Sequence, residues 1–245
     1  MRFQDHVAIV TGGASGIGLA TAIRLGSEGC RVVLVGRNQD RLREAEQQVR
    51  QAGAPDVWAS VCDVAEEDQV AATTQGTLER FGRLDVVVNN AGVMEFKPLQ
   101  DLTGDDWLRT LRVDLLGAFY FIKQAFLHMQ SGGSIVNVAS IHAVEPSPLV
   151  APYAAAKAAM LSLTRSAALE GKPKGLRVNV VLPGAIDTPM LWENPNIKSG
   201  VEKLDPADVG RAEDVAAAIA YLASADARFV QGAGLRVDGG RLDQL

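Results

Sequence analysis

The sequence is poor in the features that mark metalloproteins, membrane proteins and secreted proteins. Its 245 residues include two cysteines and three histidines, with no CxxC pair and no cluster spaced for a metal, so no metal site is predicted. Cys30 and Cys62 stand in apolar surroundings, which favours two small buried side chains. No apolar run approaches the ~18 residues of a membrane span. No signal-peptide pattern precedes the first apolar run, so the predicted compartment is the cytoplasm.

Basic residues are also fewer than acidic residues. The chain has 24 Lys and Arg against 29 Asp and Glu, a net charge of −5. No basic run offers a track for a phosphodiester backbone, so nucleic acid is not an expected partner. Because no apolar run is long enough for a span, a membrane is not expected either. Hydrophobic residues make up 47% of the chain and charged residues 22%, which is typical of a globular protein with a sizeable core.

Short apolar runs alternate with helix-like segments along almost the whole chain. Segments such as Arg41–Gln51 and Glu66–Arg80 predict helices, the second ending at Gly82 as a C-cap. The apolar runs read as strands buried on both faces. They are Val7–Val10, Val32–Val35, Val57–Val61, Val86–Val88, Ser134–Val138, Arg177–Val181 and Leu235–Val237. This alternation predicts an α/β fold in one domain over residues 1–245, a parallel sheet with helices on both faces.

One irregular stretch, Ile186–Gly210, is rich in Pro, Asn and Asp. Long loops in compact domains are usually functional lids or binding loops. We therefore interpret residues 186–210 as a substrate-covering loop.

A glycine-rich loop, TGGASGIG at Thr11–Gly18, follows the first predicted strand and opens the first predicted helix. Gly12, Gly16 and Gly18 allow a sharp turn and a close approach of the backbone to a pyrophosphate. The helix that follows then points its free N–H groups at the phosphates. A glycine triplet alone is also compatible with an ordinary strand-to-helix turn, but this context is the one that a dinucleotide site requires.

Further motifs follow in a fixed order along the chain. They are CDV at Cys62–Val64, NNAG at Asn89–Gly92, Ser140, YAAAK at Tyr153–Lys157, RVNVVLPG at Arg177–Gly184 and VDGG at Val237–Gly240. With these motifs the sequence resembles the short-chain dehydrogenases/reductases from end to end. The resemblance implies a Rossmann-type, doubly wound sheet of about seven parallel strands and a nicotinamide cofactor.

The resemblance also implies which residues contact the cofactor. Outside this family pattern, Asp63 would read as a helix N-cap and Asn89–Asn90 as a turn. The implied contacts are Gly12, Ser15, Gly16, Ile17, Gly18, Arg37, Asp63, Val64, Asn90, Ala91, Gly92, Tyr153, Lys157, Pro183, Gly184, Ile186 and Thr188.

The end of the second predicted strand bears on the choice between NAD and NADP. An NAD site usually places a carboxylate there for the ribose hydroxyls, whereas this chain has Gly36 followed by Arg37. A guanidinium pairs bidentately with a 2′-phosphate, so NADP is favoured over NAD. Against this, Ser15 stands where many NADP-using relatives carry a cation, and Arg37 also reads as a solvated surface charge.

Tyr153 and Lys157 are spaced to share one face of a helix. A neighbouring ammonium stabilises a tyrosinate, so we expect the pKa of Tyr153 to lie below the usual ~10. In the family that the chain resembles, Ser140, Tyr153 and Lys157 act together. Tyr153 is then the general acid/base and Ser140 holds the substrate oxygen.

Asp114 is a departure from the family pattern, which usually has Asn at this place in a kinked helix. We include Asp114 among the candidate catalytic residues with Ser140, Tyr153 and Lys157. Asp either substitutes for Asn without consequence or favours the charged form of Lys157 and alters the proton path.

The predicted function is NAD(P)-dependent interconversion of a secondary alcohol and its ketone by hydride transfer, with a small-molecule substrate. The alternative from another class is a catalytically silent nucleotide-binding sensor or scaffold, and an epimerase or dehydratase is a third possibility. The resemblance further implies a homotetramer. Apolar faces of Asp105–Met129 and Tyr153–Glu170 would serve that assembly, although packing on the sheet explains much of the same pattern.

Overall fold

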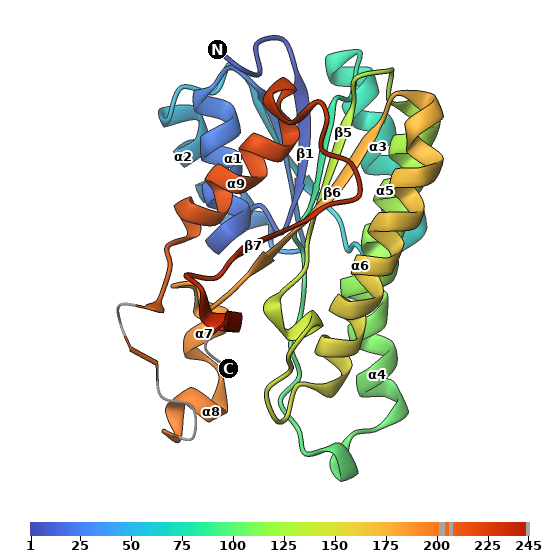
Figure 1. Ribbon diagram of the computed structural model, residues 1–245. Helices are drawn as coiled ribbons and strands as arrows, with labels where there is room; N and C mark the ends of the chain where they lie inside the picture. The colour runs from blue at the N-terminus through green and yellow to red at the C-terminus, as the bar shows by residue number, and fades with distance from the viewer. Residues whose placement is uncertain (201–203, 206–207, 244–245) are drawn as a thin grey trace.

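Seven parallel strands form the centre of the computed structural model, which describes residues 1–200, 204–205 and 208–243. Their order across the sheet is β3-β2-β1-β4-β5-β6-β7 (Figure 1). The strands are β1 Val7–Thr11, β2 Arg31–Gly36, β3 Val57–Val61, β4 Val86–Asn89, β5 Ser134–Val138, β6 Arg177–Pro183 and β7 Gly234–Val237. All seven predicted runs form strands, and the predicted doubly wound sheet is confirmed.

Helices cover both faces of the sheet because its strands are apolar on both sides. In β1, Val7 and Ile9 join the core of one face, whereas Ala8 and Val10 join the core of the other. Figure 1 shows the two helical layers on either side of the strands. One layer consists of α1 Gly16–Ser27, α2 Gln39–Gln51 and α9 Ala212–Ala223, and the other of α3 Glu67–Phe81, α5 Gly117–His128 and α6 Ala151–Gly171.

Two local predictions are borne out in the fold. Gly82 ends α3 in the left-handed conformation with φ 75°, and its N–H donates to the carbonyl of Leu78 at 2.8 Å. A glycine at this position avoids the strain that a Cβ would bring. Cys30 and Cys62 are both free and buried, and burial raises the pKa of each thiol. They serve as small apolar side chains of the core.

The helix that follows β4 is interrupted by a π-helical turn. It begins as α4, Gly104–Leu111, which Thr103 and Asp106 start with a capping box. The turn, η2, spans Arg112–Leu116, and the chain then continues as α5. Such turns widen the backbone ladder and often lie at functional sites. Asp114 lies in this turn, where the family resemblance implies a kink.

The segment predicted as a substrate-covering loop contains two short helices, α7 Pro189–Trp192 and α8 Pro195–Lys198. An isolated parallel bridge pairs Ile186 with Gly210 and so joins the two ends of the segment. Residues 201–203 and 206–207 of the predicted loop lie outside the described residues.

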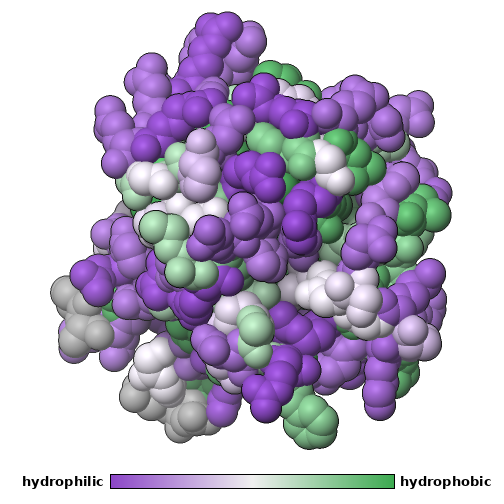
Figure 2. Space-filling view, turned by 90° about the horizontal axis from the view of Figure 1, so that it is seen from above, coloured by the Kyte–Doolittle hydropathy of each residue, from purple (hydrophilic) through white to green (hydrophobic). Residues whose placement is uncertain are grey.

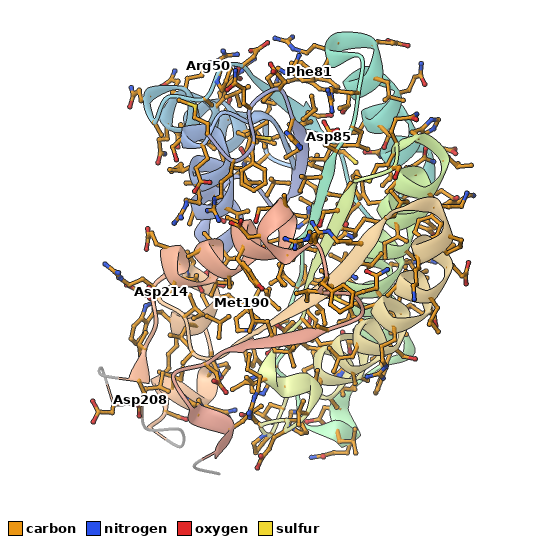
Figure 3. The ribbon with its side chains drawn as sticks, turned by 45° about the horizontal axis from the view of Figure 1, so that its top comes forward. Arg50, Phe81, Asp85, Met190, Asp208 and Asp214 are labelled. Carbon is orange, nitrogen blue, oxygen red and sulfur yellow. The ribbon has the colours of Figure 1, made fainter. Side chains whose placement is uncertain are left out.

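The carboxyl and amino ends of the strands lie at opposite ends of the molecule. The loops after the carboxyl ends of β4 to β7, together with α7 and α8, gather at the lower end in Figure 1. Figure 2 looks down on the opposite end, where hydrophilic side chains predominate. Asp85 lies at that opposite end, far from Met190 in α7 (Figure 3). Within the described ranges, no helix has the length and apolar character needed to span a membrane.

Candidate active site

A cavity of about 260 Å³ lies at the carboxyl ends of β1, β4, β5 and β6. The strand order reverses between β1 and β4, the place where doubly wound sheets bind their ligands. Of the residues predicted from the sequence, the following line this cavity: Gly12, Ser15, Gly16, Ile17, Asn90, Ala91, Gly92, Ser140, Tyr153, Lys157, Pro183, Gly184, Ile186 and Thr188. The structure thus brings together segments from nearly the whole chain.

The glycine loop forms one end of the cavity. Gly12 and Gly16 have φ of 63° and 51°, a conformation that side-chain-bearing residues rarely adopt. A Cβ on Gly18 would lie 2.2 Å from the carbonyl oxygen of Gly12, so only glycine permits this turn. Gly18 does not itself line the cavity, but it allows the loop that does.

A polar network holds the glycine loop against β4. The Thr11 hydroxyl accepts hydrogen bonds from the backbone N–H groups of Asn90 and Ala91, both at 2.9 Å. The Asn90 side chain donates in return to the Thr11 carbonyl at 3.0 Å. Asn90 is therefore a brace between the two strand ends as well as part of the cavity wall. Sequence reasoning did not single out Thr11 as the other half of this brace.

The start of α1 fits an anionic group such as a diphosphate. Ser15 is its N-cap residue but makes no capping hydrogen bond with its side chain, and no acidic residue stands in the first turn of this described helix. The first N–H groups of a helix have no partners within the helix, and its positive dipole end attracts anions. Together with the glycines, these groups would hold the diphosphate of a dinucleotide.

Besides Gly18, three predicted cofactor residues stand outside the cavity wall. Arg37 follows β2 with 67% of its side chain exposed, and its guanidinium lies 4.0 Å from the Asp63 carboxylate after β3. Asp63 also accepts a hydrogen bond from the Ala65 N–H at 3.0 Å. Val64 is buried in the core. Arg37 and Asp63 thus belong to the same edge of the sheet as the cavity but flank it.

Tyr153 and Ser140 face the cavity from α6 and from the end of β5. Both are buried, with exposed fractions of 6% and 7%. Hydrogen bonding with Ser140 favours the ionised form of Tyr153. The Ser140 hydroxyl also accepts a hydrogen bond from the His142 N–H at 3.1 Å. The His142 ring meets the Tyr153 ring edge to face, with 6.2 Å between the centroids.

Lys157 forms a buried ion pair with Asp114. Its ammonium lies 3.3 Å from Oδ2 of Asp114 and donates to the Val138 carbonyl at 3.0 Å. The Val93 N–H donates to Oδ1 of Asp114 at 2.8 Å. Gly92 leaves room for the pair, since a Cβ there would approach Oδ2 to 2.9 Å. Asp114 is fully buried behind the cavity wall and reaches the cavity through Lys157.

The pKa of Tyr153 is raised, so the prediction of a lowered value is wrong. Burial is the main cause, because the phenolate loses its hydration. The Lys157 ammonium lowers the pKa as predicted, but the Asp114 carboxylate raises it and so offsets part of that effect. Burial likewise raises the pKa of Asp114, against the pull of Lys157 and of the Val93 N–H. The sequence does not reveal how deeply these groups are buried.

The cavity is also lined by residues to which the sequence assigned no role. The lining includes Met94, His142, Met190 and Leu191. It does not include Glu95, Phe96 and Trp192, which are their neighbours in the sequence. Arg241 lines the cavity from the turn η7, Arg241–Asp243, after β7. It directly follows the VDGG motif at Val237–Gly240, but that motif assigned no role to Arg241 itself. Its place depends on the path of the chain after β7.

Comparison with known proteins identifies the family. Residues 12–241 match the family model described as enoyl-(acyl carrier protein) reductase. The chain is 43% identical to a cis-4-hydroxycyclohexanecarboxylate dehydrogenase from Sinomonas cyclohexanicum, covering 97% of each protein. It is 39% identical to a 3beta-hydroxysteroid dehydrogenase 1 from Eggerthella lenta, covering 97% of this chain and 94% of that one.

Solved structures agree with this assignment. The crystal structure of levodione reductase superposes with a TM-score of 0.94 at 34% identity over the whole of both chains. A short-chain dehydrogenase from Burkholderia cenocepacia J2315, solved in complex with NADP, superposes with a TM-score of 0.91 at 33% identity over 98% of each chain. The chain is a short-chain dehydrogenase/reductase. A further relative in this family is NAD+-bound xylitol dehydrogenase, with a TM-score of 0.89 at 33% identity over 98% of this chain and 100% of that one.

As a short-chain dehydrogenase/reductase, the protein is an NAD(P)-dependent oxidoreductase that interconverts an alcohol and a ketone. The cavity end formed by the glycine loop fits the nicotinamide dinucleotide that this reaction requires. The relatives lend no support to the alternative, a catalytically silent sensor or scaffold.

Proposed function

We propose that the protein interconverts a secondary alcohol on a saturated carbon ring and the corresponding ring ketone, with Tyr153 as general acid/base. The observation that carries this proposal is the convergence of Ser140, Tyr153 and Lys157 on one cavity wall. The names of two relatives, a hydroxycyclohexanecarboxylate dehydrogenase and a hydroxysteroid dehydrogenase, both describe a hydroxyl group on a saturated ring. Apolar residues of the cavity lining such as Met94 and Met190 suit such a ring.

Each residue of the proposed group has a separate task. Tyr153 passes its phenolic proton to the ketone oxygen, or takes the proton from the alcohol in the reverse direction. Ser140 holds the same oxygen through its hydroxyl and so fixes the distance to Tyr153. Lys157, itself held by Asp114 and Val138, stabilises the phenolate that forms. The nicotinamide ring, when bound, supplies or accepts the hydride.

The raised pKa of Tyr153 favours one direction of the reaction at neutral pH. A phenol that keeps its proton is ready to donate it to a ketone, whereas oxidation of the alcohol needs the phenolate. We therefore expect ketone reduction to be efficient near neutral pH and alcohol oxidation to rise as the pH becomes alkaline.

For the cofactor we propose NADP in preference to NAD. Relatives of both kinds exist, one solved with NADP and one with NAD+. Gly36 leaves no carboxylate at the end of β2, and the exposed Arg37 guanidinium beside it suits a 2′-phosphate. Asp63 competes for that guanidinium at 4.0 Å, so the preference rests on Arg37 exchanging this weak surface pair for the phosphate.

The remaining predictions concern the surroundings of the site. The sequence-predicted cofactor contacts, from the glycine loop to Thr188, are kept as the proposed binding residues. The segment 186–210 is proposed to cover the substrate, since Met190 and Leu191 of α7 line the cavity. A cytoplasmic location is likewise kept as a proposal.

A homotetramer is proposed from the family resemblance and from exposed apolar side chains. Leu108 of α4 is 51% exposed, Phe119 and Leu127 of α5 are 41% and 64% exposed, and Leu169 of α6 is 76% exposed. The helices that carry these side chains contact one another, α4 and α5 each with α6, and apolar surface on neighbouring helices suits an interface between protein chains. Light scattering of the purified protein tests the assembly, and the mass of a single chain would contradict it.

Oxidation of NADPH in the presence of ketones tests the proposed reaction. We expect cyclohexanone derivatives to be reduced with a higher kcat/KM than open-chain ketones of similar size. Absence of turnover with any ketone, despite tight binding of NADPH, would contradict the proposal and favour a binding protein. Equal rates for cyclic and open-chain ketones would contradict the ring preference alone.

A further inference from the structure

Asn194 is a buried polar residue of the cavity wall that the proposed reaction does not use. It is 6% exposed and lies between the short helices α7 and α8. Its main-chain groups are occupied, because its N–H donates to the Leu191 carbonyl at 3.2 Å and its carbonyl accepts from the N–H of Lys198 at 3.0 Å. The side chain is therefore the part of Asn194 that remains to meet a ligand.

A capping contact fixes which way the Asn194 amide faces. Its Oδ1 accepts a hydrogen bond from the N–H of Asn196 at 2.9 Å. Because an N–H needs an acceptor, the amide oxygen lies at this contact and the nitrogen, Nδ2, on the other side. No described residue accepts a hydrogen bond from Nδ2. Nor is Nδ2 sealed in the core, as the unpartnered oxygens of Asn89 and Asp114 are. It presents two N–H donors to the cavity that Asn194 lines.

The segment that carries Asn194 runs from the glycine loop to the turn before α6. At its start, Thr188 packs on the glycine loop, since a Cβ on Gly16 would lie 3.1 Å from the Thr188 methyl group. At its end, Nδ2 of Asn196 donates to the Pro148 carbonyl at 3.1 Å. Asn194 is joined directly to this second anchor by the hydrogen bond from Asn196. The two contacts place Asn194 beside the turn before α6.

That turn leads into the surroundings of the reacting phenol. Val150, at the end of the turn, packs with Tyr153 in an apolar cluster that Met94 and Phe96 adjoin. Met94 also lines the cavity. A donor without a partner in such surroundings is costly, so a ligand that brings an acceptor is favoured over one that does not.

We propose that Nδ2 of Asn194 donates a hydrogen bond to an acceptor oxygen that the substrate carries besides its reacting oxygen. A carbonyl, ester or hydroxyl oxygen on the ring has the required chemistry. This inference rests on the proposed reduction of a ring ketone at Tyr153, and it adds a second oxygen function to the substrate. The carboxamide oxygen of the nicotinamide is the other source of such an acceptor, and the experiment separates the two.

The experiment compares two ring ketones of the same shape. Methyl 4-oxocyclohexanecarboxylate carries an acceptor carbonyl, and 4-(butan-2-yl)cyclohexanone has a methyl group in its place. Their reduction at saturating NADPH is measured for the wild type, Asn194→Asp, Asn194→Ser and Asn38→Ser. Asp and Ser both keep an oxygen for the Asn196 N–H but remove the amide nitrogen. Asn38 caps α2 in a similar way, outside the cavity wall, with an oxygen that accepts from the Arg41 N–H at 3.0 Å.

Asn194→Asp and Asn194→Ser should each lower kcat/KM for the ester by roughly 5- to 100-fold, the range for a buried acceptor that loses its donor. The alkyl ketone should change by less than about threefold, and Asn38→Ser should behave as the wild type. Equal losses for the two ketones, or no loss for either, would overturn the proposal. Equal losses together with weaker binding of NADPH would assign the donor to the nicotinamide carboxamide instead.

A second measurement keeps the donor testable if the reaction itself is misassigned. Should the wild type reduce neither ketone, the proposed function fails, and binding of both ketones to the NADPH complex is then followed by nicotinamide fluorescence. A loss of affinity for the ester alone in the two Asn194 variants supports the donor. Unchanged affinity for the ester, or binding of neither ketone, refutes it. Thermal melting shows whether each variant is folded.

Discussion

At the glycine loop the cavity wall is mostly backbone, whereas elsewhere it consists largely of side chains from segments widely separated in the sequence. Gly12 and Gly16 add no side chain to the loop that would keep a diphosphate from its main chain, and Thr11 and Asn90 brace the loop. Elsewhere in the wall, Met190 and Arg241 come from separate late segments of the chain. A backbone cradle serves any dinucleotide, while a wall of side chains can be altered residue by residue. The contrast explains how one fold accepts one cofactor class and many alcohols.

Tyr153→Phe gives the largest expected effect, because it removes the only phenol proposed to exchange a proton. We expect kcat to fall by about 10²–10⁴-fold, the range for loss of a general acid/base. Steady-state kinetics with NADPH and a cyclic ketone measure the loss. Binding of NADPH, followed by fluorescence, should weaken far less than kcat falls, since the Tyr153 hydroxyl is one of many proposed cofactor contacts and the glycine loop is untouched. A comparable loss of binding would show that the two ends of the cavity are not independent.

Gly18→Ala tests the backbone end in the same way. The new Cβ would lie 2.2 Å from the Gly12 carbonyl oxygen and 2.6 Å from the Asn90 amide nitrogen, so the loop must shift. Overpacking of this kind costs about 1–3 kcal/mol. If the cost falls on the bound state, NADPH binds roughly 10- to 100-fold more weakly.

Gly104→Ala is the matched control for Gly18→Ala. Gly104 opens α4, and a Cβ there would meet no atom within 4 Å. Calorimetric titration with NADPH should give the wild-type affinity for this variant. Unchanged affinity in Gly18→Ala would mean that the loop does not hold the diphosphate.

Arg37→Ala examines whether the flanking edge of the sheet discriminates between the two cofactors. We expect kcat/KM for NADP to fall about tenfold, the lower end for a charged hydrogen bond, because Arg37 is 67% exposed and solvent weakens its interactions. The value for NAD should hold within about twofold. Arg43→Ala, which removes another exposed cation, should alter neither value. The NADP preference would be refuted by a higher kcat/KM for NAD in the wild type, or by equal NADP kinetics in Arg37→Ala.

The contrast between the glycine loop and the rest of the cavity wall also explains which features could be predicted from the sequence. Consecutive β-branched residues and the glycines of Thr11–Gly18 act within a few positions of the chain, so strands and cradle were predicted close to their observed bounds. The place of Arg241 depends on a turn at Gly239–Gly240, which belong to the VDGG motif, and also on the packing of Asp238 against Gly184, which no local pattern encodes. The predicted direction of the Tyr153 pKa shift was wrong for the same reason, because burial is a property of the assembled molecule.

Asp114→Asn has the smallest expected effect on the reaction rate, and it tests directly whether the Asp114 carboxylate acts on Tyr153. Asn keeps the shape of the side chain and an oxygen for the Val93 N–H, so kcat/KM at neutral pH should change by no more than a few-fold. The Asp114 carboxylate raises the pKa of Tyr153, so its removal should lower that pKa. The phenolate then forms at a lower pH, and the alkaline rise of alcohol oxidation should move in that direction. The pH–rate profiles of the wild type and of Asp114→Asn measure this shift, and melting curves show whether the variant is folded. An unmoved profile, or one displaced to higher pH, would mean that Asp114 is a tolerated replacement whose charge does not reach Tyr153.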